Sequence, residues 1–192
     1  MHKIIRQFLF LLTVISFITG CAKRGTPVGG PKDVDPPKVL MTTPSNNVVN
    51  YTPDKEIKIS FDEYIVLKDA NQEIVISPPL DERLNAMVNN KNIIVKFPAD
   101  AKFEDATYTI NFGKSIADNN EGNILNNYEF VFSLKDYIDS LNIDGHIINS
   151  FDLKHEKERF FVMLYNNLSD SAPIKEKPKF IARTDEDGNF SL

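Results

Sequence analysis

The sequence predicts an all-β protein whose main body is a β-sandwich of about seven strands. Short segments alternate between apolar and polar residues, and a period of two is typical of half-buried strands. About seven such segments fall within roughly 100 residues, separated by turn residues, which is the spacing of a sandwich. None keeps the 3.6-residue period of an amphipathic helix. The segments are 39–41, 57–61, 74–76, 86–88, 93–97, 108–112 and 128–132.

The residues between these segments favour turns. Asn89-Asn90-Lys91-Asn92 separates two alternating runs and predicts a hairpin, since Asn tolerates the backbone conformations that tight turns need. The third segment ends at Pro78-Pro79, and prolines are tolerated where a strand stops. Residues 67–72 could form a single helical turn.

A second β unit is expected over residues 138–192. Residues 143–148 favour a strand, and the continuous apolar run 160–165 predicts a central strand covered on both faces. Residues 179–183, followed by 185–190, predict a strand, a tight turn and another strand. Because the sequence stops within an alternating segment, we expect this domain to be truncated and the chain to be the N-terminal part of a longer protein.

The N-terminus has the layout of a lipoprotein signal. Lys3 and Arg6 precede an apolar run over 8–18, and Gly20-Cys21 follows with the only cysteine of the chain. The run is far shorter than the roughly 20 residues of a membrane-spanning helix. An ordinary secretory signal would need an A-x-A-like site, which this stretch lacks. The segment resembles a lipobox, in which a peptidase cuts just before the cysteine.

Three regions are expected before the second unit. The lipobox resemblance implies a signal peptide over 1–20 and a lipid on Cys21, composition indicates a flexible tether over 21–37, and the alternation places the sandwich over 38–135. The tether is rich in glycine and proline and has few large apolar side chains, so it cannot offset the entropy of folding. Cys21 would carry a diacylglycerol and a further acyl chain such as palmitate. At about 0.8 kcal/mol per buried methylene, several chains form a stable anchor.

Charge and anchor together predict the location and partners. Removing residues 1–20 takes away Lys3 and Arg6 and no acid, so the formal net charge changes from −5 to −7. Nucleic acid is not expected as a partner, because phosphate binding needs a basic face. We expect an outer-membrane lipoprotein with an envelope protein as partner. Lys23 and Arg24 stand where surface-directed lipoproteins carry acids, which favours the periplasmic face over the cell surface.

A set of short motifs in the first unit points to a family. They are Asp35-Pro36-Pro37, Pro44, Ile57-Lys58-Ile59-Ser60-Phe61-Asp62-Glu63, Tyr108-Thr109-Ile110-Asn111-Phe112 and Ile116-Ala117-Asp118-Asn119-Asn120-Glu121-Gly122-Asn123. With them, residues 35–134 resemble the SbsA-type bacterial Ig-like domain. Together with Cys21-Ala22-Lys23-Arg24-Gly25, the whole resembles an Ig-like-domain lipoprotein of the Bacteroidetes type. The resemblance implies a scaffold, spacer or binding module, and it carries no catalytic site to transfer.

The second unit contains the pattern Thr-Asp-x-x-Gly-x-Phe at Thr184, Asp185, Gly188 and Phe190. Through this turn, residues 138–192 are similar to the start of a carboxypeptidase-regulatory or transthyretin-like β-sandwich.

Two oxygen-rich loops are weak calcium candidates, through Asp118 and Asn120 in one and Asp185 and Asp187 in the other. A calcium site needs six to eight oxygen ligands, often with a closing bidentate acid, and no such acid stands at the right spacing after Asp118. Asn and Gly also serve tight turns, because they tolerate a positive φ. We therefore favour turns and expect no metal and no cofactor.

The sequence predicts that the protein is not an enzyme. It contains neither G-x-S-x-G nor H-E-x-x-H, and no glycine-rich phosphate loop. Asp62 and Glu63 are neighbours, so on a strand they would point to opposite faces. His146 and His155 make a poor metal pair without a cysteine nearby.

The leading hypothesis is a non-enzymatic, lipid-anchored envelope protein that acts as an Ig-like scaffold or protein-interaction module of an outer-membrane assembly. One alternative is a glycan-binding or calcium-linked adhesion module, and another is the non-catalytic N-terminal part of a longer enzyme. Ser140 and Ser171 each follow an aspartate in a short pattern used for O-glycosylation in Bacteroidetes, and they are candidate modification sites.

Overall fold

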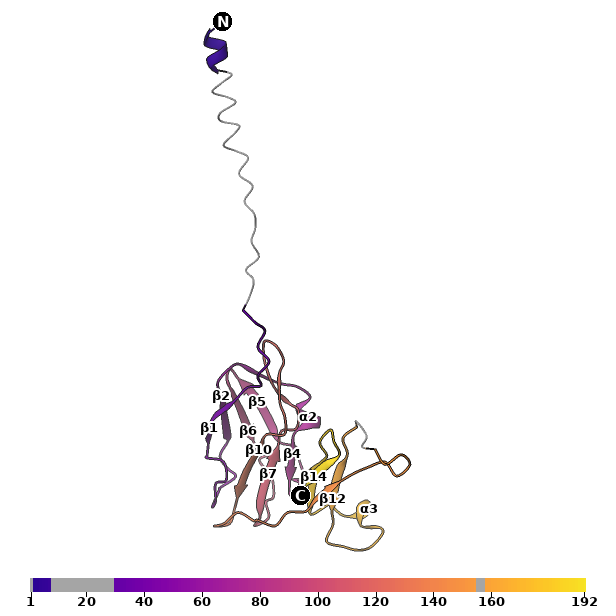
Figure 1. The fold of residues 1–192 in the computed structure, drawn as a ribbon. Coiled ribbons are helices and arrows are strands. Elements are labelled where there is room, and N and C mark those ends of the chain that lie inside the picture. Colours follow the sequence, from indigo (N-terminus) through magenta and orange to yellow (C-terminus); the bar gives the residue numbers. More distant parts are fainter. Residues whose placement is uncertain (1, 8–29, 155–157) are drawn as a thin grey trace. The chain divides into compact units, whose positions relative to one another are not determined.

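The computed structural model describes residues 2–7, 30–154 and 158–192. The chain divides into two units, Met1–Lys32 and Asp33–Leu192 (Figure 1). In the first unit, residues 2–7 are helical and exposed. No helix in the described ranges is both long enough and apolar enough to cross a membrane.

Two antiparallel sheets form the body of the second unit, and together they contain the seven strands that the alternation predicts (Figure 1). The strand order is β1-β2-β6-β5 in the first sheet and β10-β7-β4 in the second. The prediction of an all-β sandwich is therefore confirmed. The bounds are β1 (Val39–Thr43), β2 (Ile57–Phe61), β4 (Val75–Ser77), β5 (Asn85–Asn89), β6 (Asn92–Lys96), β7 (Thr107–Asn111) and β10 (Glu129–Ser133).

Three further strands form a small third sheet in the order β3-β8-β9. They are β3 (Ile65–Leu67), β8 (Ile116–Asp118) and β9 (Ile124–Leu125). The sequence does not predict them, because residues 67–72 favour a helical turn and the polar residues 118–123 favour a tight turn. A one-turn helix, α2 (Ala70–Glu73), overlaps the segment for which a single helical turn is expected.

The predicted hairpin between β5 and β6 is confirmed. The strands are paired up to Asn89 and Asn92, so only Asn90 and Lys91 form the turn. Asn90 has a φ of 57°, in the left-handed region that Asn occupies more readily than most residues. The polar sequence at this point thus supplies the backbone conformation that the turn requires.

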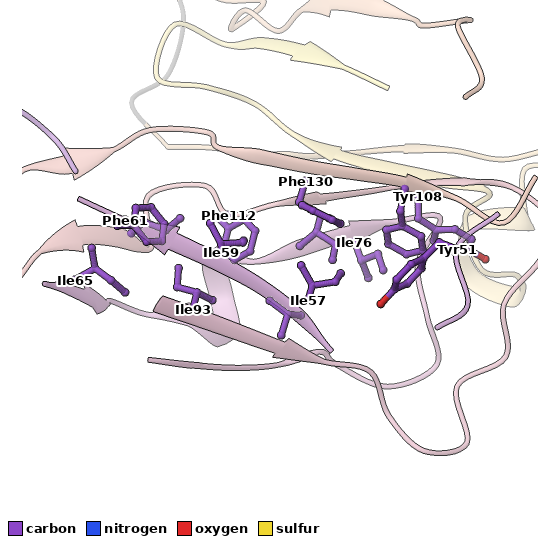
Figure 2. Packing of buried hydrophobic residues seen from close by; sticks show 14 of the residues in the cluster. Tyr51, Ile57, Ile59, Phe61, Ile65, Ile76, Ile93, Tyr108, Phe112 and Phe130 are labelled. Atoms are coloured by element: carbon purple, nitrogen blue, oxygen red, sulfur yellow. The ribbon is translucent and has the colours of Figure 1, made fainter. Parts of the chain in front are cut away.

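The core lies between the two main sheets and follows from the period of two. Ile57, Ile59 and Phe61 alternate along β2, and all three point inward. Figure 2 shows them facing Tyr108 and Phe130, which come from β7 and β10 of the other sheet. The side chains between them point outward, so the buried face of each strand also determines what its outer face presents.

One end of the core is an aromatic cluster around Phe132. Its ring is stacked on Tyr108 with the centroids 5.3 Å apart, and it meets Tyr51 and Phe97 edge-on at 4.9 and 5.5 Å. Aromatic pairs in such geometries contribute about 0.5–1.5 kcal/mol each beyond the burial of their area. This cluster therefore ties the segment before β2, which carries Tyr51, to both sheets.

Residues 138–192, here called the C-terminal segment, form two two-stranded sheets. β11 pairs with β14, and β12 pairs with β13. The predicted strand, tight turn and strand are confirmed as β13, the turn at 186–187 and β14, and the two strands pair with different partners, β12 and β11. The elements are β11 (Asp144–His146), β12 (Phe161–Leu164), α3 (Ala172–Lys175), β13 (Phe180–Arg183) and β14 (Asn189–Ser191).

The prediction of a central strand over residues 160–165 is wrong. β12 pairs only with β13 among the strands of the described ranges. Its side chains alternate, so Phe161 and Met163 are 48% and 46% exposed while Val162 and Leu164 are partly buried. A continuous apolar run records only composition, and it cannot reveal that one face of the strand stays open.

Phe132→Ala should destabilise the protein by about 3–5 kcal/mol, because it removes the centre of the aromatic cluster and leaves a cavity. Chemical denaturation measures the change. The matched control is Phe151→Ala, whose ring is 96% exposed, and its effect should stay within about 0.5 kcal/mol. Equal effects of the two substitutions would contradict this account of the core.

Candidate functional site

A groove of about 1020 Å³ lies between the outer face of the β10-β7-β4 sheet and the C-terminal segment. The sheet provides the floor, while residues 138–145 and strands β13 and β14 provide the walls. The volume is at the upper end of the range of about 300–1,000 Å³ found for ligand pockets. The groove is therefore large enough to hold a ligand.

The floor is polar because the core takes the apolar residues of the same strands. Tyr108 and Ile110 of β7 are buried, which leaves Thr107, Thr109 and Asn111 on the outer face. The amide of Asn111 donates a 2.8 Å hydrogen bond to the Glu129 carboxylate on neighbouring β10. Hydroxyl, amide and carboxylate groups thus line the floor together with two valine side chains, Val75 of β4 and Val131 of β10.

Most charged groups lining the groove already have partners. The Lys135 ammonium lies 2.8 Å from the Asp139 carboxylate and holds the pKa of Asp139 below its ordinary value. The Asp185 carboxylate accepts hydrogen bonds within its own turn, and Arg183 pairs with Glu73. In the described ranges Glu129, Asp144 and Asp185 form no ion pair with a Lys or Arg, so the lining of the groove is net acidic.

The C-terminal segment is fastened to the sandwich at Glu73, the last residue of α2. The Glu73 side chain is only 13% exposed and forms an ion pair with Arg159. Arg183 Nη1 lies 3.5 Å from the same carboxylate, and the backbone N–H of Lys114 donates to it at 2.9 Å. Burial acts to raise the pKa of Glu73, but these partners outweigh it and hold the pKa below the ordinary value.

The carboxylate of Glu73 is tightly enclosed, and the neighbouring position 113 requires glycine. Gly113 has a φ of 54°, and a Cβ at this position would lie 2.5 Å from Glu73 Oε2. Only glycine meets both conditions without strain. Arg183 Nη1 also donates to the Gln72 carbonyl at 2.7 Å, and its guanidinium lies 5.2 Å from the Phe161 ring centroid. The carboxylate is thus enclosed by α2, the loop after β7 and the C-terminal segment.

In the described ranges, four more ion pairs join the sandwich to the C-terminal segment. Lys177 pairs with Asp81, Lys179 with Glu104, Glu186 with Lys114, and Asp139 with Lys135. Each includes an exposed side chain, so each adds about 0–1 kcal/mol at most. Counting both pairs at Glu73, an acid of the sandwich meets a base of the segment in four of these six pairs, which favours one orientation of the segment.

The first calcium candidate loop is organised around Asp118. Its carboxylate is buried and accepts four backbone N–H bonds of 2.6–3.0 Å, from residues 120, 121, 122 and 123. Burial acts to raise the pKa of Asp118, but the four bonds lower it below its ordinary value. Because donors surround the carboxylate, it closes a turn. Asn120 itself is exposed and contributes its backbone N–H.

The second candidate loop uses the same arrangement. Asp185 Oδ1 accepts the backbone N–H groups of Asp187 and Asn189 at 2.9 and 2.8 Å, and Oδ2 accepts the Asn189 side-chain amide at 3.0 Å. Asp185 thereby closes the turn between β13 and β14. In the ranges that the structure describes, no three His, Cys, Asp or Glu residues are placed to hold a metal ion.

Within the described ranges, none of the other sequence candidates lies on the groove floor. Cys21 and His155 fall outside the described residues. His146 Nδ1 lies 3.0 Å from the Asn189 side-chain oxygen, and Asp62 accepts the backbone N–H of Lys38 at 2.8 Å. Among the glycosylation candidates, Ser140 is exposed and lines the groove, whereas Ser171 is partly buried just before α3.

Sequence reasoning misses Glu73, Arg159 and Arg183. Glu73 and Arg159 are 86 residues apart, and neither belongs to a motif. An acid in a short polar segment looks like any solvated residue, so one sequence holds no signal that these three meet. The groove is missed for the same reason, since its floor and walls are formed by segments spread from residue 75 to residue 192.

A family model described as a bacterial Ig-like domain matches residues 33–134. The resemblance of residues 35–134 to a bacterial Ig-like domain is therefore confirmed. The matched range begins where the compact unit does, at Asp33, so residues 33–37 of the expected tether fall within both. Domains of this family are typically non-catalytic scaffolds or interaction modules. No curated protein matches the chain.

Glu73→Gln should destabilise the protein by about 2–3 kcal/mol, since it leaves two arginines without their carboxylate. The value lies below the roughly 3–5 kcal/mol for breaking a fully buried pair, because the side chains retain some exposure. Glu56→Gln is the matched control, as its pair with Lys96 is half exposed, and it should lose about 1 kcal/mol at most. Chemical denaturation of both variants is the measurement. Indistinguishable losses would refute the role given to Glu73.

Asp118→Asn should lower the melting temperature at neutral pH, because the charged acceptor for four N–H groups is lost. The folded-state pKa of Asp118 is depressed, so its stabilisation is complete above the ordinary Asp value of about 3.9 and disappears as the pH falls through the folded-state pKa. The gap between wild type and variant should therefore be widest at neutral pH and close in acid. Asp136→Asn, at an exposed site, serves as control. A gap that is independent of pH would contradict the assignment.

Proposed function

The chain belongs to the bacterial Ig-like domain family, and from this premise we propose that it is a non-catalytic, lipid-anchored envelope protein. It would hold an Ig-like scaffold beside the outer membrane and present the C-terminal segment to a protein of an envelope assembly. The observation that carries the proposal is the combination of this domain with the lipobox-like Gly20-Cys21 behind a short apolar run.

The distances along the chain support this arrangement. Residues 22–32 separate Cys21 from the compact unit, and 11 residues reach at most about 40 Å when fully extended. Such a tether keeps the Ig-like domain close to the membrane surface. The basic residues Lys23, Arg24 and Lys32 would each gain about 1 kcal/mol beside anionic headgroups, and they favour the periplasmic face.

The ion pairs to the sandwich support a role in presentation. Glu73 pairs with both Arg159 and Arg183, and Arg183 lies on β13. The C-terminal segment is therefore held to the sandwich by ion pairs as well as by the connecting chain. A scaffold benefits from such an attachment, since a pre-ordered surface loses less conformational entropy when a partner binds.

Cys21→Ser should abolish acylation and release the protein from the membrane fraction, because the thioether to diacylglycerol cannot form. Metabolic labelling with an alkyne-bearing palmitate, followed by membrane fractionation, measures both effects. Ser16→Ala, in the same signal segment, should keep the label and the membrane association. Labelled Cys21→Ser protein, or unlabelled wild type, would overturn the anchor.

The proposed interaction with an envelope protein can be tested separately, using the membranes prepared for the acylation test. Wild-type protein extracted from membranes with mild detergent should migrate in a complex, and Glu73→Gln should weaken that complex. A wild-type protein that always migrates alone would contradict the role while leaving the anchor intact.

A further inference from the structure

The groove contains polar groups that the protein itself does not use. In the part of the chain that the structure describes, the side chains of Asn47, Thr109 and Asn127 form no hydrogen bond with another residue, although all three line the groove. Their neighbours Asn111 and Glu129 are fixed to one another at 2.8 Å. The floor therefore offers donors and acceptors on a rigid strand framework.

The walls supply apolar surface. Phe180 and Phe190 both line the groove. The Phe190 ring packs directly on Gly145, where a Cβ would lie 2.3 Å from the ring and could not be accommodated. The absence of a side chain at Gly145 thus allows the ring to sit against β11. An aromatic ring beside hydroxyl and amide groups suits a ligand with both apolar C–H faces and many hydroxyls.

The electrostatics disfavour an anionic ligand. Arg183 is engaged with Glu73 and Asp139 with Lys135, while the carboxylates of Asp144 and Asp185 accept hydrogen bonds from neutral groups and keep their negative charge. Glu129 also shares its carboxylate with Asn111. No cluster of bases faces the floor to hold a phosphate, sulfate or carboxylate polymer, since Arg183 is the single Arg or Lys among the residues lining the groove.

The sheet edges argue against an added peptide strand. Strand addition needs a free edge with unpaired backbone groups. On the β10 edge, the backbone N–H of Asn47 donates to the Val131 carbonyl at 2.9 Å. On the β4 edge, the backbone N–H of Ile181 donates to Ser77 Oγ at 3.0 Å, and β13 runs alongside. Both edges of the floor sheet are covered, so a ligand must be recognised by side chains on the face.

We propose that this groove binds a neutral oligosaccharide, with Asn47, Thr109, Asn127 and Glu129 bonding its hydroxyls and the rings of Phe180 and Phe190 contacting its C–H faces. The site is separate from the lipid anchor and does not depend on it. It also adds a ligand class to a chain for which the Ig-like family by itself implies only a scaffold or interaction module.

The test is affinity electrophoresis of the protein in gels containing neutral polysaccharides (dextran, laminarin, mannan and xyloglucan) or the anionic polysaccharide alginate. At least one neutral polymer should retard the wild type. Thr109→Arg fills the floor and should weaken that binding by about tenfold or more, equivalent to about 1.4 kcal/mol. Thr52→Arg makes the same change at an exposed residue outside the groove and should migrate like wild type.

Thr109→Val keeps the shape and strand preference of the side chain, so it tests the hydroxyl if the arginine variant fails to fold, and it should weaken binding by a smaller factor. Retardation by alginate alone would replace the proposal with an anionic ligand. Retardation that neither Thr109 variant reduces would place the binding elsewhere. No retardation by any of the neutral polymers would overturn the proposal.

Discussion

Residues 33–192 depend on one constraint, the exclusion of water from the inner faces of the two main sheets. Ile57, Ile59 and Phe61 meet Tyr108 and Phe130 across that space, with Phe132 closing one end. Because strand side chains alternate, each residue committed to the core places its neighbour on the outside. The polar floor of the groove is thus the other half of the pattern that builds the core, and no separate feature of the sequence is needed to create it.

The C-terminal segment is attached to the sandwich by several kinds of contact. Ion pairs form around the largely buried carboxylate of Glu73 and at exposed sites, and the backbone N–H of Ile181 donates a hydrogen bond to Ser77 Oγ. Partial burial makes the Glu73 interactions strong, whereas the exposed pairs mainly select an orientation. Since Glu73 immediately precedes the β4 region, the segment is fastened at that edge of the sheet. The open space beyond it, above β7 and β10, is the groove.

The turns at Asp118 and Asp185 are stabilised in the same way. A tight turn leaves backbone N–H groups without partners, and leaving them unsatisfied in a buried place is costly. Asp118 and Asp185 each accept several of these groups with one carboxylate. This explains why the loops look like calcium sites in sequence: acids and small polar residues suit both a cation and a ring of N–H donors. The geometry separates the two, because the donors already occupy the oxygens.

The sequence by itself determined the fold class, the seven main strands, the β5–β6 hairpin and the resemblance to a bacterial Ig-like domain, because alternation and turn chemistry are local signals. It could not determine β3, β8 and β9, whose surroundings favour turns, or the open face of β12, where Phe161 and Met163 look as apolar as core residues. Only the tertiary structure brought Glu73 to Arg159 and Arg183, and placed Thr109 and Phe190 in the lining of one groove. Such meetings depend on how distant segments pack together, and the spacing of residues along one chain carries no record of that packing.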